Sequence, residues 1–219
     1  MAGPSVRYVD SVARVAVSNV WCVGRNFHKH ALELGNDVPS QPLVFLKATS
    51  SLRALAAGPL AHGSEEFHHE AECVLLVGAT VPLGGLPRDE LLRCVHGVGL
   101  GLDLTRRGLQ SELKKQGLPW LMAKSFAGAA PVSDFVAEFD LSAIEYSLEV
   151  NGKRRQRARF ADMIFDVPRL LAHIASTHEL LPGDIVFTGT PEGVGPIRRG
   201  DRFRLAFENG ASGVFDGQL

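Results

Sequence analysis

One stretch of the sequence joins charged residues directly to an apolar run: His68-His69-Glu70-Ala71-Glu72-Cys73-Val74-Leu75-Leu76-Val77-Gly78. An apolar run of this length that ends at glycine predicts a buried β-strand. Side chains two positions apart lie on the same face of a strand, so Glu70 and Glu72 are predicted to point the same way. Two such carboxylates repel each other and lose hydration unless a positive charge lies between them, which a bound cation would supply. The alternative is a solvated strand end whose acids contact only water or a nearby arginine, and this strand alone supports both interpretations equally.

The composition is that of a globular chain with its own core. The 219 residues are 45% hydrophobic and 21% charged, so we expect a single domain over 1–219, with a short strand region at 1–19. A formal net charge of −1 argues against an overall field that would attract nucleic acid or an anionic membrane. No apolar segment approaches membrane-spanning length. We therefore expect a cytoplasmic protein with neither nucleic acid nor membrane as a partner.

The cysteines and the basic residues suggest no special site. Cys22, Cys73 and Cys94 are widely spaced and form no C-x-x-C pair, which argues against a disulfide framework and a structural zinc site. Asn151-Gly152 predicts a β-hairpin with a primed turn. The basic cluster at 153–157 lacks interleaved aromatic residues, and we predict that it is a solvated arm of this hairpin.

A short helix is predicted before the central strand, with Asn26 as its cap and Gly35 at its end. His30 and Glu33 are three positions apart and share a face of this helix. That spacing would let the carboxylate hold an imidazole nitrogen, as a general base and its orienting group require. Spacing alone favours the plainer interpretation, two polar groups on an exposed helix.

Two further charged residues stand out after the central strand. Glycines alternate with apolar residues over 96–105, which predicts a strand with close backbone approaches, and Asp103 lies where this strand meets a helix that Thr105 is predicted to cap. A lone acid there is as often a cap as a ligand. Lys124 follows an apolar stretch and either extends to the surface, the commoner case, or points into a site that uses its charge.

The predicted strands outnumber the helices without a regular βαβ alternation. This pattern favours an α+β fold, β-rich with a mixed sheet and a few short helices. One of the helices is predicted over 167–176, with Asp166 as its cap.

A series of motifs is spread in order from Val20 to Asp201: Gly24-Arg25-Asn26-Phe27 with His30 and Glu33, Phe45-Leu46-Lys47, His68-His69-Glu70-Ala71-Glu72, Asp103-Leu104-Thr105-Arg106, Gln110, Lys114-Lys115-Gln116-Gly117-Leu118-Pro119-Trp120, Ala123-Lys124-Ser125-Phe126, Pro131-Val132-Ser133 and Thr188-Gly189-Thr190-Pro191-Glu192-Gly193-Val194-Gly195. Together these motifs resemble the fumarylacetoacetate hydrolase family, and the nearest subgroup is the short one-domain members that act on acylpyruvates and oxaloacetate.

The resemblance implies the fold of the family's C-terminal domain, a homodimer, a divalent cation (Mg²⁺ or Mn²⁺) and a 2-oxo acid substrate. Oxygen ligands are those that such hard cations prefer. Three departures, His28-Lys29, Ala48 and Gly108, bear on lid behaviour and substrate identity. By family position, the metal ligands are Glu70, Glu72 and Asp103, the catalytic residues are His30 and Glu33 on a mobile lid together with Lys124, and the substrate-binding residues are Arg25, Gln110 and Thr190.

The leading functional hypothesis is hydrolysis of a C–C bond in an acylpyruvate-type 2,4-dioxo acid such as fumarylpyruvate or acetylpyruvate. Water deprotonated by His30 would attack the distal carbonyl, and pyruvate would leave as a metal-bound enolate stabilised by Lys124. Oxaloacetate decarboxylation would give the same enolate, and keto–enol tautomerisation or isomerisation would need only proton transfer. The presence of both His30 and Glu33 favours bond cleavage.

Two other classes of function are weaker. A Schiff-base lyase acting through Lys124 would need a deprotonated lysine, whereas three carboxylates nearby would keep it charged. A non-catalytic relative would be expected to have lost the His30–Glu33 pair or a ligand, and the sequence retains them.

Overall fold

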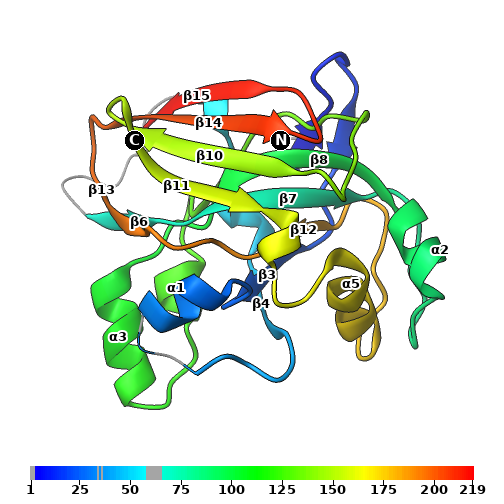
Figure 1. Ribbon diagram of the computed structural model, residues 1–219, viewed down its shortest axis with the longest axis horizontal. Coiled ribbons are helices and arrows are strands. Elements are labelled where there is room, and N and C mark those ends of the chain that lie inside the picture. Colours follow the sequence, from blue (N-terminus) through cyan, green and yellow to red (C-terminus); the bar gives the residue numbers. More distant parts are fainter. Residues whose placement is uncertain (1–2, 34, 36, 58–65) are drawn as a thin grey trace.

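The computed structural model describes residues 3–33, 35, 37–57 and 66–219. Its centre is a seven-stranded mixed sheet in the order β4-β3-β12-β7-β8-β9-β5 (Figure 1). The strands are β3 (Val20–Gly24), β4 (Leu43–Lys47), β5 (Leu52–Ala54), β7 (Ala71–Val77), β8 (Val95–Leu102), β9 (Ala130–Val132) and β12 (Ile185–Phe187).

The apolar run that follows Glu70 forms β7, and all seven residues of this strand are buried. Strand periodicity divides its side chains between two cores: Cys73 and Leu75 belong to one apolar cluster, whereas Val74 and Leu76 belong to the other. The predicted buried strand is therefore confirmed. The close approach expected for the glycines of β8 also occurs, since a Cβ at Gly101 would lie 2.9 Å from a neighbouring ring and a carbonyl oxygen.

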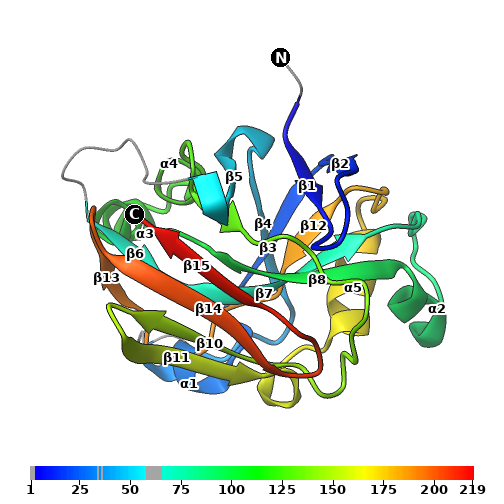
Figure 2. The same cartoon turned by 90° about the horizontal axis from the view of Figure 1, so that it is seen from above.

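A four-stranded antiparallel sheet, β11-β10-β14-β15, covers one face of the central sheet (Figures 1 and 2). Its inner face adds Leu148 and Leu205 to the core cluster that contains Cys73. Asn151 and Gly152 have φ angles of 51° and 72°, so the predicted primed turn is confirmed. The strands are β10 (Glu145–Val150), β11 (Lys153–Arg159), β14 (Arg202–Asn209) and β15 (Val214–Gln218).

The helices are short and lie at the two ends of the molecule. α1 and α3 lie at the end opposite α2 and α5 (Figure 1), and Figure 2 shows α4 at the same end as α3. None of the described helices is both long and apolar enough to cross a membrane. The remaining elements are α1 (His28–Glu33), α2 (Arg88–Arg93), α3 (Arg107–Lys115), α4 (Leu121–Lys124), α5 (Val167–Ala175), the 3-10 turns η1 (Thr49–Ser51), η2 (Leu55–Ala57) and η3 (Phe160–Asp162), and the paired strands β1 (Ser5–Arg7) with β2 (Arg14–Ala16) and β6 (Phe67–His69) with β13 (Gly195–Ile197).

One of the three predicted helix caps is confirmed. Asp166 accepts a hydrogen bond from the backbone N–H of Arg169 at 3.1 Å and caps α5. Thr105 was the wrong cap for α3, because the capping position is Arg106 and the Thr105 hydroxyl donates instead to the carbonyl of Asp103 at 3.1 Å.

Asn26 does not cap α1 either. Its side-chain amide donates to the carbonyls of Phe165 (3.0 Å) and Thr188 (2.8 Å), and its Oδ1 accepts from the N–H of Phe165 at 2.8 Å. The buried amide thus joins the segment before α1 to two distant parts of the chain. Gly35 lies in the left-handed conformation (φ 63°) just after α1, as expected of a residue that ends a helix.

Candidate functional site

Three carboxylates come together at one end of the central β7–β8 pair. Glu72 lies on β7 opposite Gly101 of β8, and two pairs further along the N–H of Asp103 donates to the carbonyl of Glu70 at 2.8 Å. Glu70, Glu72 and Asp103 each offer an oxygen, and these atoms lie within 4.8 Å of one another. Their side chains are buried, with exposures of 5%, 1% and 2%. The strand register therefore assembles the three predicted ligands, and the solvated strand end is the wrong interpretation.

Lys124 is the main counter-charge of this acid cluster. Its Nζ donates to Glu70 Oε2 and to Asp103 Oδ2, both at 2.6 Å. Arg107 contacts the other oxygen of Glu70. Lys124 is only 4% exposed, so it points into the site and does not extend to the surface.

The charge on Lys124 also argues against a Schiff-base mechanism. Burial by itself would lower the pKa of this lysine, but the carboxylates of Asp103 and Glu70 outweigh it and raise the pKa above its ordinary value. The amine is therefore held as an ammonium, which cannot attack a carbonyl. The geometry argues against a Schiff-base enzyme.

Lys47 is a second buried lysine at the cluster, and it leaves one carboxylate oxygen without a donor. Its Nζ lies 2.7 Å from Asp103 Oδ1. Its N–H groups, however, are directed at the carbonyls of Leu104 (3.3 Å), Lys124 and Ala129 (3.1 Å). Asp103 Oδ1 is consequently buried near a positive charge but accepts no hydrogen bond. A buried lone pair of this kind is available to a metal ion.

The protonation of the glutamates shows where positive charge is missing. Burial raises the pKa of Glu72 well above its ordinary value, and the neighbouring carboxylates of Asp103 and Glu70 raise it further. Burial acts in the same direction on Glu70, but Lys124 and Arg107 together outweigh it and hold the pKa of Glu70 below its ordinary value. The cluster thus lacks a cation beside Glu72. An all-carboxylate donor set with one unpartnered oxygen fits Mg²⁺ or Mn²⁺.

His30 of α1 lines the same cavity as Glu70 and Glu72, and Glu33 follows one turn later on the helix. His30 is buried (4% exposed), so the exposed-helix interpretation is wrong for this residue. Its Nδ1 lies 3.4 Å from Glu33 Oε2, a long contact of the kind that tightens when a ligand binds. The N–H of Gly193 donates to both oxygens of Glu33, at 3.1 and 3.2 Å. Since a carboxylate only accepts, this arrangement assigns a proton to Nδ1 of His30 and leaves Nε2 free to act as a base.

The pKa of His30 suits this role. Burial lowers it from the ordinary histidine value, and the nearby carboxylates of Glu70 and Glu33 only partly oppose that effect. The imidazole is therefore neutral at pH 7, which is the form that takes up a proton.

The three predicted substrate-binding residues line the same cavity as His30. Arg25 has a left-handed backbone (φ 57°), which is uncommon for a residue other than glycine. Gln110 accepts a hydrogen bond from Arg107 at 2.6 Å, and the hydroxyl of Thr190 donates to the carbonyl of Ala71 at 2.8 Å. The space open to water-sized spheres in this cavity is only about 30 Å³.

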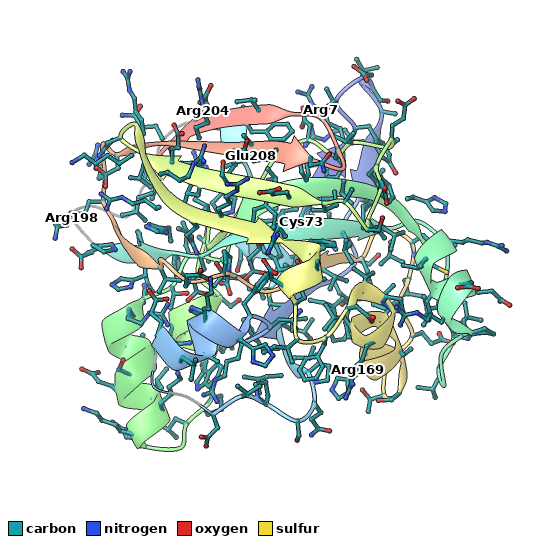
Figure 3. The ribbon with its side chains drawn as sticks, in the orientation of Figure 1. Arg7, Cys73, Arg169, Arg198, Arg204 and Glu208 are labelled. Atoms are coloured by element: carbon teal, nitrogen blue, oxygen red, sulfur yellow. The ribbon has the colours of Figure 1, made fainter. Side chains whose placement is uncertain are left out.

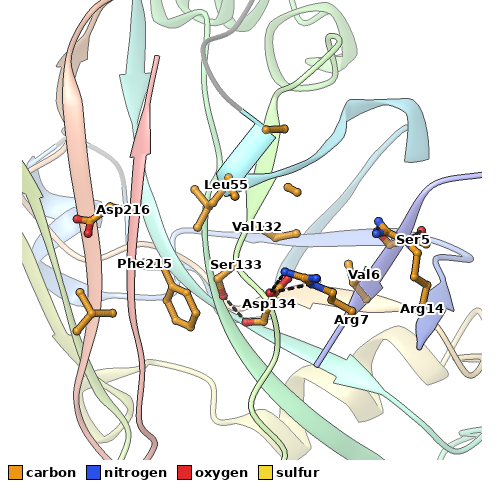
Figure 4. Close-up of a pocket in the computed structure, with 14 residues that line it drawn as sticks. Ser5, Val6, Arg7, Arg14, Leu55, Val132, Ser133, Asp134, Phe215 and Asp216 are labelled. Atoms are coloured by element: carbon orange, nitrogen blue, oxygen red, sulfur yellow. Dashed lines mark hydrogen bonds and ion pairs between the residues drawn. The ribbon is translucent and has the colours of Figure 1, made fainter. Parts of the chain in front are cut away.

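A much wider cavity, about 500 Å³, lies between β1, β5, β9 and β15 (Figure 4). Arg7 and Asp134 form an ion pair at 2.8 Å along its wall. It contains none of the predicted site residues. The smaller cavity is the better candidate because charged and nucleophilic groups converge there.

Gln156 is a site residue that the sequence analysis missed. Its Oε1 accepts from the N–H of Ala71 (2.9 Å) and faces His69 Nδ1 (3.0 Å), whereas its Nε2 donates to the Thr190 hydroxyl (2.8 Å) and the Pro191 carbonyl (3.0 Å). The basic arm is solvated as predicted except at this position, which is 2% exposed. The available signal was that Gln156 is the only uncharged residue in the cluster.

Lys47 and Arg107 were also missing from the predicted site. Lys47 carried the same signal as Lys124, a lysine that directly follows an apolar run. Arg107 carried no comparable signal, because an arginine in the first turn of an amphipathic helix is ordinarily solvated.

Comparison with known proteins shows the family of the chain. The family model described as "Fumarylacetoacetate (FAA) hydrolase C-terminal" matches residues 19–213. The oxaloacetate tautomerase YcgM of Escherichia coli is 41% identical over 198 residues, covering 88% of this chain and 89% of the relative. A mitochondrial oxaloacetate tautomerase of Mus musculus is 38% identical over 194 residues, covering 87% of each chain.

Solved structures give the same result. Fumarylpyruvate hydrolase from Pseudomonas aeruginosa, solved with Mn²⁺ and pyruvate, superposes with a TM-score of 0.89 at 32% identity, over 100% of this chain and 96% of the other. The 5-carboxymethyl-2-hydroxymuconate delta-isomerase from Mycobacterium smegmatis gives a TM-score of 0.79 at 30% identity, over 94% and 78%. The β-rich fold and the family predicted from the sequence are thereby confirmed, and the chain belongs to the fumarylacetoacetate hydrolase family.

Proposed function

We propose that this enzyme interconverts the keto and enol forms of a short 2-oxo acid, with oxaloacetate as its substrate. The observation that carries the proposal is the placement of a buried, neutral imidazole, His30, in one cavity with Glu70, Glu72 and Lys124. Tautomerisation needs a base at the carbon beside the oxo group and positive charge at the oxo oxygen. The site offers both groups. The similarity to oxaloacetate tautomerases adds support.

Each residue then has a definite task. Glu70, Glu72 and Asp103 would hold Mg²⁺ or Mn²⁺, which supplies a Lewis acid for the negative charge of a 2-oxo acid. Lys124 uses two of its three N–H donors on carboxylates of the cluster, so the third is available to the substrate oxygen.

His30 carries out the proton transfer. In enol formation, Nε2 of His30 removes the proton from the carbon beside the oxo group, the C–H electron pair becomes part of the new C=C bond, and the oxygen takes up a proton from the solvent. Glu33 holds the Nδ1 proton and so stabilises the imidazolium that forms.

Hydrolysis of an acylpyruvate is the second candidate. A histidine oriented by a carboxylate can deprotonate water as well as carbon, and the chain resembles a fumarylpyruvate hydrolase over its full length. Hydrolysis would place a water molecule between the imidazole and the distal carbonyl. Tautomerisation needs no such water. Decarboxylation of oxaloacetate would start from the same bound oxaloacetate as tautomerisation.

One set of assays separates these reactions. In the presence of Mg²⁺ or Mn²⁺, the purified protein is tested for decay of the oxaloacetate enol, for pyruvate release from oxaloacetate, and for cleavage of acetylpyruvate and fumarylpyruvate. We expect enol decay to be the fastest reaction and His30→Ala to slow it by about 10²–10⁴-fold. Faster acylpyruvate cleavage would replace the tautomerase assignment by the hydrolase one. An unchanged rate in His30→Ala would remove the proposed base.

A further inference from the structure

Helix α3 presents one polar stripe to the cavity. Arg107, Gln110 and Lys114 are spaced by three and four positions, so they lie on one helical face, and all three line the cavity. Arg107 is at the deep end of this stripe, where it contacts Glu70 and donates to Gln110. Lys114 is at the other end of the stripe, seven residues or about two helical turns beyond Arg107.

Lys114 is held in place by an aromatic ring. Its Nζ lies 5.1 Å from the ring centroid of Trp120, which also lines the cavity. The lysine is only partly exposed. Its position is therefore set by packing against the cavity wall and does not depend on a salt bridge.

Among the described residues, Lys114 has no acidic partner. The cationic groups that line this cavity divide into two classes. Lys124 and Arg107 are paired with Glu70, whereas Lys114 and Arg25 form no ion pair with any residue that the structure describes. Burial lowers the pKa of Lys114, and repulsion from Arg25 lowers it further, whereas Glu70 only partly opposes these effects. Two like charges are thus kept in one cavity, and an anionic ligand would relieve the electrostatic cost of their repulsion.

The charge distribution matches a ligand with two separated carboxylates. The acid cluster with its cation takes the 2-oxo carboxylate end of the substrate in the proposed function, and this inference rests on that assignment. We propose that Lys114, together with Arg25, binds the carboxylate at the far end of the substrate, and that Lys114 thereby selects a dicarboxylic 2-oxo acid over one with a neutral tail. Oxaloacetate and pyruvate differ by that one carboxylate, and they form a matched pair of ligands.

The test measures binding separately from turnover. Calorimetry in the presence of Mg²⁺ gives dissociation constants for pyruvate and for difluoro-oxaloacetate, a dicarboxylate that has no hydrogen beside the oxo group and cannot enolise. Wild type is compared with Lys114→Gln, Lys114→Arg and the control Lys115→Gln, which changes the exposed neighbour on the same helix. An unfolding midpoint for each variant establishes that it is folded.

We expect Lys114→Gln to weaken the binding of difluoro-oxaloacetate about tenfold, because one charge-assisted hydrogen bond is lost, and to leave pyruvate binding unchanged. Lys114→Arg should restore dicarboxylate binding, and Lys115→Gln should match wild type. In the oxaloacetate assay, Lys114→Gln should raise KM and leave kcat nearly unaltered, since the group lies away from the reacting carbon.

The outcomes separate this inference from the proposed function. Equal weakening of both ligands, or of neither, in Lys114→Gln would overturn the role of Lys114. A wild-type protein that binds difluoro-oxaloacetate through Lys114 but leaves oxaloacetate unchanged would overturn only the tautomerase assignment. Failure of the wild type to bind either ligand would overturn both.

Discussion

Two ion pairs of nearly equal length lie in opposite environments. Lys124 and Asp103 are 2.6 Å apart with side-chain exposures of 5% and 2%, whereas Arg204 and Asp216 are 2.8 Å apart with exposures of 56% and 64%. Figure 3 shows Arg204 at the periphery, on the four-stranded sheet. Water screens the outer pair, and such pairs contribute little to stability. The inner pair has no water to replace either partner, so each charge depends on the other.

The comparison extends to the sheets that carry the two pairs. The outer surface of the four-stranded sheet has several further ion pairs, including Arg157 with Glu145 and Arg154 with Glu208. These charges balance one another beside solvent. At the acid cluster, three carboxylates face two lysines and one arginine, but among the described residues these cations form ion pairs only with Glu70 and Asp103. Burial and the neighbouring carboxylates keep the pKa of Glu72 raised. Uneven pairing of the buried charges therefore distinguishes the functional region from the merely charged one.

The largest effect is expected from Lys124→Met. Removing the ammonium leaves Glu70 and Asp103 buried without their shared partner, which should cost about 3–5 kcal/mol of unfolding free energy. Loss of a donor to the substrate oxygen should lower kcat by about 10²–10³-fold. Urea unfolding in the presence of a chelator and steady-state kinetics measure the two effects.

Arg204→Met is the matched control, with an exposed pair of the same length. It should leave both the unfolding midpoint and kcat unchanged, because solvent takes the place of the lost partner. Equal losses of stability and kcat in the two variants would mean that burial does not change what an ion pair contributes in this protein.

Glu72→Gln tests whether missing positive charge destabilises the metal-free cluster. The pKa of Glu72 is raised in the folded state, so the folded protein binds this proton more tightly than the unfolded chain does. In a chelator, stability should then fall as pH rises above the ordinary glutamate value of 4.5 and continue to fall towards the raised pKa. The amide imitates the protonated acid, and Glu72→Gln should flatten this part of the pH profile.

The same variant tests metal binding. Mg²⁺ should stabilise the wild type at neutral pH by mass action, and loss of a ligand should weaken that binding by at least about tenfold. Unfolding midpoints across a Mg²⁺ titration give the comparison. If Glu72→Gln showed the same Mg²⁺ dependence as wild type, Glu72 would not be a ligand.

A smaller effect is expected from Gln156→Leu. This change removes four hydrogen bonds, leaves the Ala71 N–H buried without an acceptor, and should cost about 1–3 kcal/mol. Because Gln156 also holds Thr190, the KM for oxaloacetate should rise more than kcat falls. Arg155→Ala, on the exposed side of the same strand, is the control. A variant with lowered stability but normal KM would limit Gln156 to a structural role.

Features that depend on residues close in sequence could be predicted without coordinates. The continuous apolar run of the buried strand β7, the Asn151-Gly152 turn and the Asp166 cap are each encoded by residues a few positions apart. The resemblance of the motifs supplied the family, the three acidic residues and the His30–Glu33 pair. The preference for C–C bond hydrolysis was less secure, because one set of groups serves proton transfer, decarboxylation and hydrolysis alike. The relatives support the tautomerase alternative better.

Other features of the fold and the site depend on contacts between segments that are distant in the sequence. Asn26 and Thr105 carry good capping signals, but their side chains found buried partners that compete with the helix ends. Gln156 lies 85 positions from Ala71, and Lys124 lies 54 positions from Glu70. No local pattern encodes such pairs, since they arise from strand register and from the requirement that every buried polar group find a partner. The sequence by itself determined which charged residues adjoin apolar strands, whereas the tertiary structure decided which of those charges are neutralised and which remain for a metal ion and a substrate.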